Sequence, residues 1–272
     1  MPNNPTHMLK LSLQRVVAYI DRLPLFTRLV VVLMLACEAV GLLPWWDIKA
    51  WGWLEPELIG LSTMYRTNTF PLIHKNVLHL LINLLSVTPM LEGFEAEHGT
   101  ITSLALFFGA LSTLPALIYV GIERLLGMNT PIMGASIWGF LLIGSEAIRR
   151  HKISPYLVIR EQPTIPTWTV PIAMLLVAAV LMPSSSVLGH VCGLGVGYTF
   201  GLGYLKFLAP PDWALRWIEG KLKLRVWLPY YVSVDQKTYG RFGVIPMANL
   251  STAPVISPGL TGSSQRLGPT PE

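Results

Sequence analysis

Long apolar runs separated by short polar stretches dominate the chain up to residue 208. The runs cover 26–44, 76–91, 101–122, 132–148, 168–183 and 187–208. A helix needs about 20 apolar residues to cross the hydrocarbon core of a bilayer, which is about 30 Å thick. The pattern therefore predicts an all-α membrane protein with a bundle of six transmembrane helices over 26–208.

The segments outside this core have other patterns. Within 1–25, residues 7–23 place apolar positions opposite Lys and Arg at helical spacing, which predicts an amphipathic helix in the cytosolic interface. Residues 209–232 combine Trp, Leu and basic residues, so we expect an interfacial or juxtamembrane segment there. From 233 to 272 Pro, Gly, Ser and Thr predominate, which is typical of a flexible, disordered tail.

Composition and charge fix an expected orientation. The chain is 52% hydrophobic and 13% charged, with a formal net charge of +5. Basic residues gather before the first run, at 149–152 and after the last run, and cytosolic loops carry such an excess of Lys and Arg. We therefore expect both termini in the cytosol. The basic clusters flank apolar runs, which argues against a nucleic-acid surface.

Four polar residues fall at one depth, near the non-cytosolic ends of three predicted helices. They are His79, Asn83, Ser136 and His190. Each alone has an ordinary structural explanation, such as a serine bonding to its own helix, but a shared depth is harder to explain that way. A serine nucleophile needs a base within hydrogen-bond reach, and a tetrahedral intermediate needs donors for its oxyanion. We predict Ser136 as nucleophile, His190 as general base, and Asn83, His79 and the Ser136 N–H as oxyanion donors.

Small residues and other polar residues add to this interpretation. Gly189, Gly193, Gly197 and Gly201 recur at a spacing of four, which lets a neighbouring helix approach closely. We expect that neighbour to be the 132–148 helix, with Gly134 and Gly139 serving the same contact. We expect His74 and His98 to be solvated loop residues. Two cysteines, Cys37 and Cys192, lie inside apolar runs, which argues against a disulfide framework or a zinc site. The expected chemistry needs no metal or organic cofactor.

Three motifs resemble the signatures of rhomboid intramembrane serine proteases. They are Gly134-Ala135-Ser136, His190 followed by Gly193 and Gly197, and His79 with Asn83. Tyr65-Arg66 and Glu95 with Gly99 resemble further family motifs. Ile137 stands where most rhomboids have Gly, and Phe140 where Tyr is usual, a version similar to the fungal rhomboid protein 2 group.

The resemblance implies a Ser–His dyad without a third acidic residue, and Phe140 packing on the His190 ring. It also implies a serine endopeptidase that cleaves other membrane proteins in or near their transmembrane segments. The fungal group implies a multi-pass protein of the secretory system, in the Golgi or the endoplasmic reticulum. With the orientation above, the active site would face the lumen.

A second interpretation is a catalytically inactive rhomboid-like adaptor that binds membrane clients. In its support, the tail resembles a short motif that binds hexameric AAA ATPases of the Cdc48/p97 type. The motif residues are Leu260, Gly262, Arg266, Leu267 and Gly268. A tail with no partner is an equal alternative. A small transporter would require a charged midplane site and internal repeats, and neither is visible in the sequence.

Overall fold

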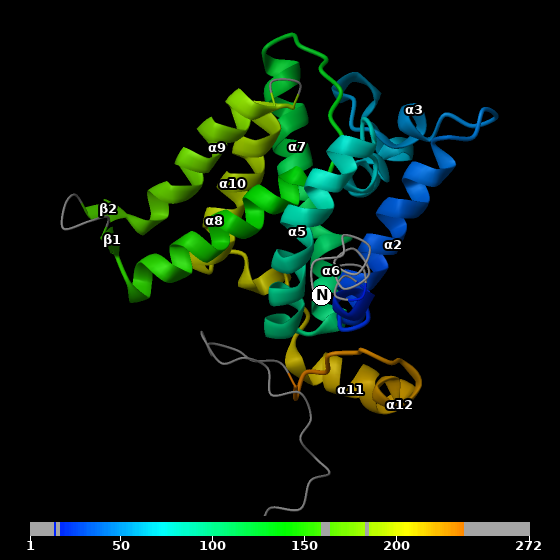
Figure 1. Ribbon diagram of the computed structural model, residues 1–272, viewed down its shortest axis with the longest axis vertical. Helices are drawn as coiled ribbons and strands as arrows, with labels where there is room; N and C mark the ends of the chain where they lie inside the picture. Colours follow the sequence, from blue (N-terminus) through cyan, green and yellow to red (C-terminus); the bar gives the residue numbers. More distant parts are fainter. Residues whose placement is uncertain (1–13, 15–16, 159–163, 183–184, 237–272) are drawn as a thin grey trace, which may run out of the picture. The chain divides into compact units, whose positions relative to one another are not determined.

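The computed structural model describes residue 14 and residues 17–158, 164–182 and 185–236, and these ranges are mostly helical (Figure 1). The longer helices are α2 (Leu25–Val40), α5 (Val77–His98), α6 (Thr100–Phe107), α7 (Ala110–Leu125), α8 (Ser136–Ile153), α9 (Val170–Leu181), α10 (Val187–Leu202) and α11 (Asp212–Leu222). The short ones are α3 (Ile48–Gly52), α4 (Arg66–Thr69) and α12 (Leu224–Trp227). Single 3₁₀ turns lie at Pro56–Leu58, Leu61–Thr63, Phe70–Leu72, Thr167–Thr169 and Lys206–Leu208.

Each of the six predicted apolar runs contains a helix. Among the described residues, α5 and the α6–α7 stretch are long and apolar enough to cross a membrane by themselves. Helix α10 and the 206–222 stretch pass the same test together, but they meet at an angle of 91°. The number of spans therefore stays a prediction. The run at 101–122 is not one continuous helix, because α6 ends at Phe107 and α7 begins at Ala110.

One element was not expected from the sequence. Strands β1 (Tyr156–Val158) and β2 (Thr164–Pro166) pair antiparallel between α8 and α9, with Leu157 opposite Ile165. The expected helix at 7–23 falls mostly outside the described residues, and so does the tail motif at 260–268.

Helices α8 and α10 are in direct backbone contact. A Cβ atom placed on Gly193 or Gly197 would overlap the carbonyl oxygen of Ile137 or Leu141 in α8. A Cβ atom on Gly201 would come within 2.6 Å of the Ser145 carbonyl oxygen. Only glycine allows an approach this close, so the predicted contact between these two helices is confirmed. We call it the glycine seam.

Gly139 of α8 and Gly134, just before that helix, do not serve this seam as predicted. A Cβ atom on Gly139 would meet Val87 of α5 at 3.4 Å, and one on Gly134 would meet His79 of α5. Both glycines were predicted to contact α10. That prediction is wrong, because they contact α5. In place of these two, Gly144 faces Leu194 of α10. A regular helix presents successive residues about 100° apart, so α8 carries small residues on two faces.

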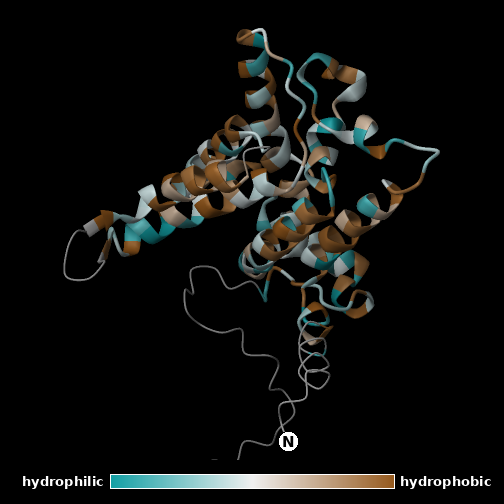
Figure 2. Cartoon of the chain, turned by 45° about the horizontal axis from the view of Figure 1, so that its top comes forward, coloured by the Kyte–Doolittle hydropathy of each residue, from teal (hydrophilic) through white to brown (hydrophobic). Residues whose placement is uncertain are grey.

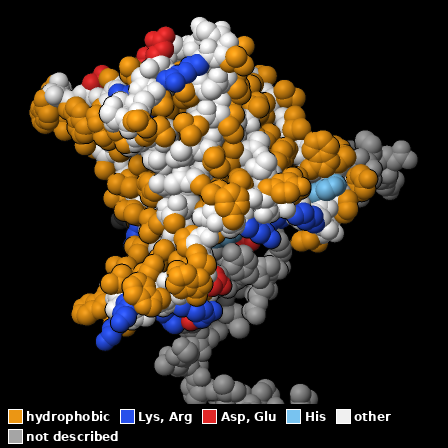
Figure 3. Space-filling model, turned by 180° about the vertical axis from the view of Figure 1, so that it is seen from behind, with side chains coloured by type: hydrophobic (Ala, Val, Ile, Leu, Met, Phe, Trp, Pro, Cys, Tyr) orange, Lys and Arg blue, Asp and Glu red, His pale blue; other side chains and the backbone are white. Residues whose placement is uncertain are grey.

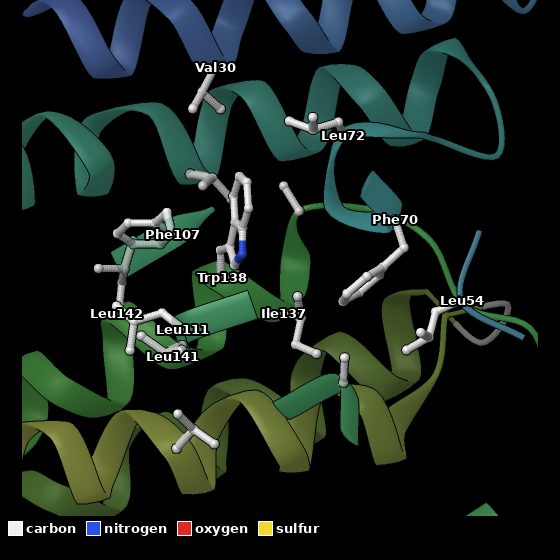
Figure 4. Close-up of a cluster of buried hydrophobic side chains, with 14 of the residues drawn as sticks. Val30, Leu54, Phe70, Leu72, Phe107, Leu111, Ile137, Trp138, Leu141 and Leu142 are labelled. Atoms are coloured by element: carbon white, nitrogen blue, oxygen red, sulfur yellow. The ribbon is translucent and has the colours of Figure 1, made fainter. Parts of the chain in front are cut away.

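The core is centred on Trp138, which is completely buried (Figure 4). Its indole N–H donates to the Ser112 hydroxyl at 2.8 Å, and the ring of Phe107 meets it edge to face. Buried Trp usually needs such a hydrogen-bond acceptor. This packing joins α8 to α6 and α7 directly behind the start of α8.

Glu95 lies in the last turn of α5 and joins that end of the helix to α2. Its carboxylate accepts hydrogen bonds from the backbone N–H groups of Phe26 and Thr27 at 2.8 Å each, and from the Thr27 and Thr100 hydroxyls. The first N–H groups of a helix lack intrahelical acceptors, and α2 has no cap from its own N-cap residue, Pro24. Glu95 therefore caps α2 from another helix.

Residues 230–234, which we call the strap, pack onto the same end. The Tyr230 carbonyl accepts from the Leu25 N–H, and Val232 exchanges two hydrogen bonds of 2.9 Å with Thr100. Ser233 and Val234 are buried. The predicted start of the flexible tail at 233 is therefore wrong, because this stretch is a packed part of the fold.

Large apolar side chains also cover much of the exterior. Figure 2 shows hydrophobic residues along most of the helical ribbons. Exposed examples on α2, α5 and α9 are Val32, Leu35, Leu78, Leu81, Leu85, Leu176, Val177, Val180 and Leu181. Apolar surface on this scale is typical of a protein whose solvent is lipid.

Candidate active site

Ser136 and His190 form a hydrogen-bonded pair. Ser136 is the first residue of α8, His190 is in the first turn of α10, and the Ser136 Oγ lies 2.9 Å from the His190 Nε2. The Phe140 ring stacks on the imidazole, with centroids 4.5 Å apart and planes 29° apart. The His190 Nδ1 has no hydrogen-bond partner among the described residues. Within the described ranges, the imidazole therefore has an aromatic ring stacked on it but no carboxylate at its second nitrogen.

Local structure explains why the two side chains meet. Ser186 caps α10 by accepting from the Gly189 N–H at 3.1 Å, which fixes the first turn that carries His190. Three residues beyond His190, Gly193 contacts the backbone of Ile137, the residue after Ser136. The glycine seam therefore begins one turn away from the pair and sets the distance between its two helices.

His79 lies against the backbone just before Ser136. Gly134 has a φ of 111°, which favours glycine, and a Cβ atom there would be 2.6 Å from the His79 Cε1. The His79 Nε2 is buried and has no partner among the described residues. Asn76 caps α5 by accepting from the His79 N–H at 2.9 Å. The ring therefore presents an unused nitrogen beside the Gly134–Ser136 backbone.

Asn83 is close to His79 but more enclosed. Its side-chain nitrogen donates to the His79 carbonyl at 3.0 Å, and the residue is 2% exposed. A Cβ atom on Gly134 would be 3.5 Å from the same nitrogen. The predicted group of four residues is thus brought together, with Asn83 set deeper than the other three.

A cavity of about 550 Å³ opens onto this group. Ser136, His190 and His79 line it, and Asn83 does not. Its walls also come from the 45–76 region, from 131–137 and from the end of α9 and the following loop, and they include Lys49, Trp53, Phe70, Lys75, Ile137, Leu181, Met182 and Ser185. Mostly apolar walls with a few converging polar groups are typical of a substrate site.

Comparison with known proteins identifies the family of the chain. A model of the rhomboid domain matches residues 61–207 of the chain. The chain belongs to the rhomboid family. It is 57% identical over 261 residues to rhomboid-type serine protease 2 of Neurospora crassa, covering 94% of each chain.

Two further relatives carry the same name. The protein of Podospora anserina is 49% identical, over 97% of this chain and all of its own. That of Gibberella zeae is 50% identical, over 93% and 95% of the two chains. These identities over almost complete chains make this rhomboid a member of the fungal group 2 and a serine protease by family.

His74 is a neighbour of the rhomboid site that sequence reasoning missed. It was expected to be solvated, but it is 1% exposed, and its ring meets the His79 ring edge to face with centroids 5.3 Å apart. Burial lowers the pKa of His74 to about 3, and the nearby His79 adds to this effect. The ring is therefore neutral near pH 7. The prediction for His98 is also wrong, because that ring is buried and stacked on Phe94.

Backbone hydrogen bonds join the 45–74 connection to residues 132–134, which precede Ser136. Leu54 and Ile132 exchange two backbone hydrogen bonds of 2.9 Å, and the Gly134 N–H donates to the Phe70 carbonyl at 2.9 Å. Within this connection, Arg66 donates to the Trp53 carbonyl and Tyr65 stacks on Trp51. The Tyr65-Arg66 motif thus stabilises the loop that positions Gly134.

Proposed function

We propose that this rhomboid is an intramembrane serine endopeptidase in which Ser136 attacks the scissile carbonyl and His190 takes its proton. The 2.9 Å hydrogen bond between the Ser136 Oγ and the His190 Nε2 carries the proposal. A neutral imidazole with its proton on Nδ1 accepts at Nε2, so it can remove the hydroxyl proton as the new bond forms. The imidazolium formed in this step then donates that proton to the leaving amine.

The oxyanion donors are the Ser136 N–H and His79, with Asn83 supporting them. Ser136 begins α8, where backbone N–H groups have no intrahelical acceptor. The His79 Nδ1 faces the Lys75 N–H at 3.5 Å, which favours a proton on Nε2, the unused nitrogen beside Gly134. Asn83 holds the His79 backbone and keeps a second amide hydrogen available. Donors fixed before the reaction stabilise developing charge most effectively.

The substrate is a membrane protein that is cut in or near a transmembrane segment. Its scissile peptide must leave the helical state first, because helical backbone groups are bonded to one another and shielded. The exposed apolar surfaces of α5 and α9 flank the cavity and support lateral entry from the bilayer. In the proposed topology six helices cross the membrane, both termini are cytosolic, and the cavity opens toward the lumen of the Golgi or the endoplasmic reticulum.

The test is covalent labelling with a fluorophosphonate in bilayers, combined with cleavage of a single-span substrate. Ser136→Ala should abolish both, and His190→Ala should reduce both by at least about 1,000-fold. Ser185→Ala is the matched control, since Ser185 lines the same cavity but donates to the Met182 carbonyl. Labelling that persists in Ser136→Ala, or that disappears in Ser185→Ala, would refute the assignment.

An inactive adaptor is the less supported candidate, because the Ser136–His190 hydrogen bond is formed. The tail motif stands as a separate, sequence-based proposal for an ATPase partner and is compatible with an active enzyme. A pull-down of the ATPase by the full chain, compared with Arg266→Ala plus Leu267→Ala, tests it. Equal recovery by both proteins would remove the proposal.

A further inference from the structure

Helices α11 and α12 expose an aromatic surface that the protease site does not use. Trp213, Trp217 and Trp227 are 75%, 63% and 74% exposed, and Val226 is 76% exposed. Figure 3 shows apolar side chains gathered in this region with Lys and Arg at the edge of the group. We call these residues of 213–227 the tryptophan surface. A contiguous exposed surface of this kind marks an interaction site.

The surface does not result from missing packing, because the opposite face of α11 contacts the strap. Leu215 is 1% exposed, and Glu219, four residues later on the same face, accepts from the Tyr231 hydroxyl at 2.7 Å and the Val234 N–H at 2.9 Å. Trp213 and Trp217 have the same spacing of four and lie on the other side. The strap therefore fixes which face of α11 is presented outward.

The angle between α10 and the following stretch indicates what covers this face. The two helical stretches meet at 91°. If α10 crosses the bilayer, as the proposed topology requires, α11 lies parallel to the membrane surface at the cytosolic end of α10. Tryptophan side chains prefer that depth, with the ring among acyl chains and the N–H among headgroups.

The charges beside the tryptophans are basic. Lys221, Lys223 and Arg225 follow Trp217 within eight residues, and among the described residues no carboxylate pairs with any of them. Of the nearby acids, Asp235 pairs with Arg216, and Glu219 accepts a hydrogen bond from Tyr231. Basic residues at a membrane surface attract anionic lipid headgroups.

We propose that the tryptophan surface binds the cytosolic leaflet and that Lys221, Lys223 and Arg225 select anionic phospholipids there. The tryptophans provide insertion, and the three cations provide the preference for headgroups. This interaction depends on the membrane topology proposed above, but it does not depend on the catalytic roles of Ser136 and His190.

The experiment uses the full chain in vesicles and measures quenching of Trp fluorescence by lipids brominated on their acyl chains. Subtracting the signal of Trp213→Phe plus Trp217→Phe plus Trp227→Phe isolates the three tryptophans. We expect brominated phosphatidylserine to quench this component at least about threefold more than brominated phosphatidylcholine at equal mole fraction. High salt should reduce the preference, because screening weakens exposed charge interactions.

Charge variants separate the two parts of the proposal. Lys221→Glu plus Lys223→Glu plus Arg225→Glu should remove the preference, whereas the charge-preserving set Lys221→Arg, Lys223→Arg and Arg225→Lys should keep it. Equal quenching by both lipids in the unmodified chain would overturn the selection of anionic lipids. Absence of quenching would overturn membrane binding. It would mean that the tryptophan surface is covered by a protein or exposed to water. Fluorophosphonate labelling of the same samples reports separately on the protease proposal.

Discussion

Helices α9 and α10 both lie against α8, but they contact it through different kinds of residues. Helix α10 presents Gly193, Gly197 and Gly201 to the α8 backbone, so no side chain separates the two. Within α9 only Pro171 and Leu175 are buried, and most of the remaining side chains are exposed. The Ser136–His190 pair is therefore built on two closely packed helices, whereas α9, which ends at the cavity, buries only two of its side chains.

The largest expected effect is a break in the glycine seam. Gly197→Ala places a methyl group where the Leu141 carbonyl oxygen lies, so the helices must separate. We expect the free energy of unfolding to fall by about 3 kcal/mol, the upper range for overpacking, and Ser136 labelling to fall more than about tenfold. Thermal unfolding in detergent and the labelling rate measure the two effects.

The control for this change lies on the same helix. A Cβ atom on Gly195 would meet no atom within 4 Å. Gly195→Ala should therefore leave both measurements unchanged or slightly raise the stability, because Ala favours helix more than Gly does. Similar losses in the two variants would mean that the seam has no special role.

The second prediction concerns the site rather than the seam. Gly134→Ala displaces the His79 ring, whose Cε1 lies 2.6 Å from the new Cβ position. We expect labelling to fall by about 100-fold, the effect of losing one oxyanion donor, with a smaller effect on stability. Gly127→Ala distinguishes displacement of the ring from backbone strain. Gly127 also has a positive φ, 65°, but a Cβ atom there would meet no atom within 4 Å. An equal loss of labelling there would assign the effect to backbone strain.

A smaller effect is expected in α9. Leu175 packs against Phe140 and Leu194, and Leu175→Ala should lower the free energy of unfolding by about 2 kcal/mol, the lower range for buried leucine. The dyad does not include α9, so Ser136 labelling should persist. Leu176→Ala, at a neighbouring position that is 61% exposed, should change neither quantity. Loss of labelling in Leu175→Ala would show that α9 supports the dyad after all.

The smallest effect belongs to one hydrogen bond. The Tyr198 hydroxyl of α10 donates to the Trp168 carbonyl just before α9, at 2.6 Å. Tyr198→Phe should lower stability by about 0.6 kcal/mol, the average for hydrogen bonds in membrane proteins. Tyr204→Phe is the control, because Tyr204 is 71% exposed. A loss above about 2 kcal/mol in Tyr198→Phe would mean that α9 is held far more firmly than its burial indicates.

The sequence predicted the glycine seam and the Ser136–His190 pair, but not the partners of every glycine. Spacing alone was enough for the glycine seam, because a repeat of four has one partner face, and shared depth was enough to place Ser136 beside His190. The catalytic roles of these residues stay predictions. Gly139 and Gly134 could not be assigned to α5 from spacing, because a glycine has no side chain to indicate which neighbour is close.

Other features depend on contacts that no local pattern encodes. His74 was predicted to be solvated because it lies at a loop position in the sequence. It is buried instead, with its ring against the His79 ring of α5. The strap was missed for a similar reason, since its burial depends on Thr100 and Glu219, which are distant in sequence or on another helix.

The strap also has a mechanical consequence. The covalent chain beyond Gln236 continues from a stretch whose backbone is bonded to Thr100, and Thr100 shares the Glu95 carboxylate with the first turn of α2. A pulling force on the tail would therefore load these hydrogen bonds before it reached any helix of the glycine seam. The strap would yield first, and only then would the load pass along α12 and α11 to α10.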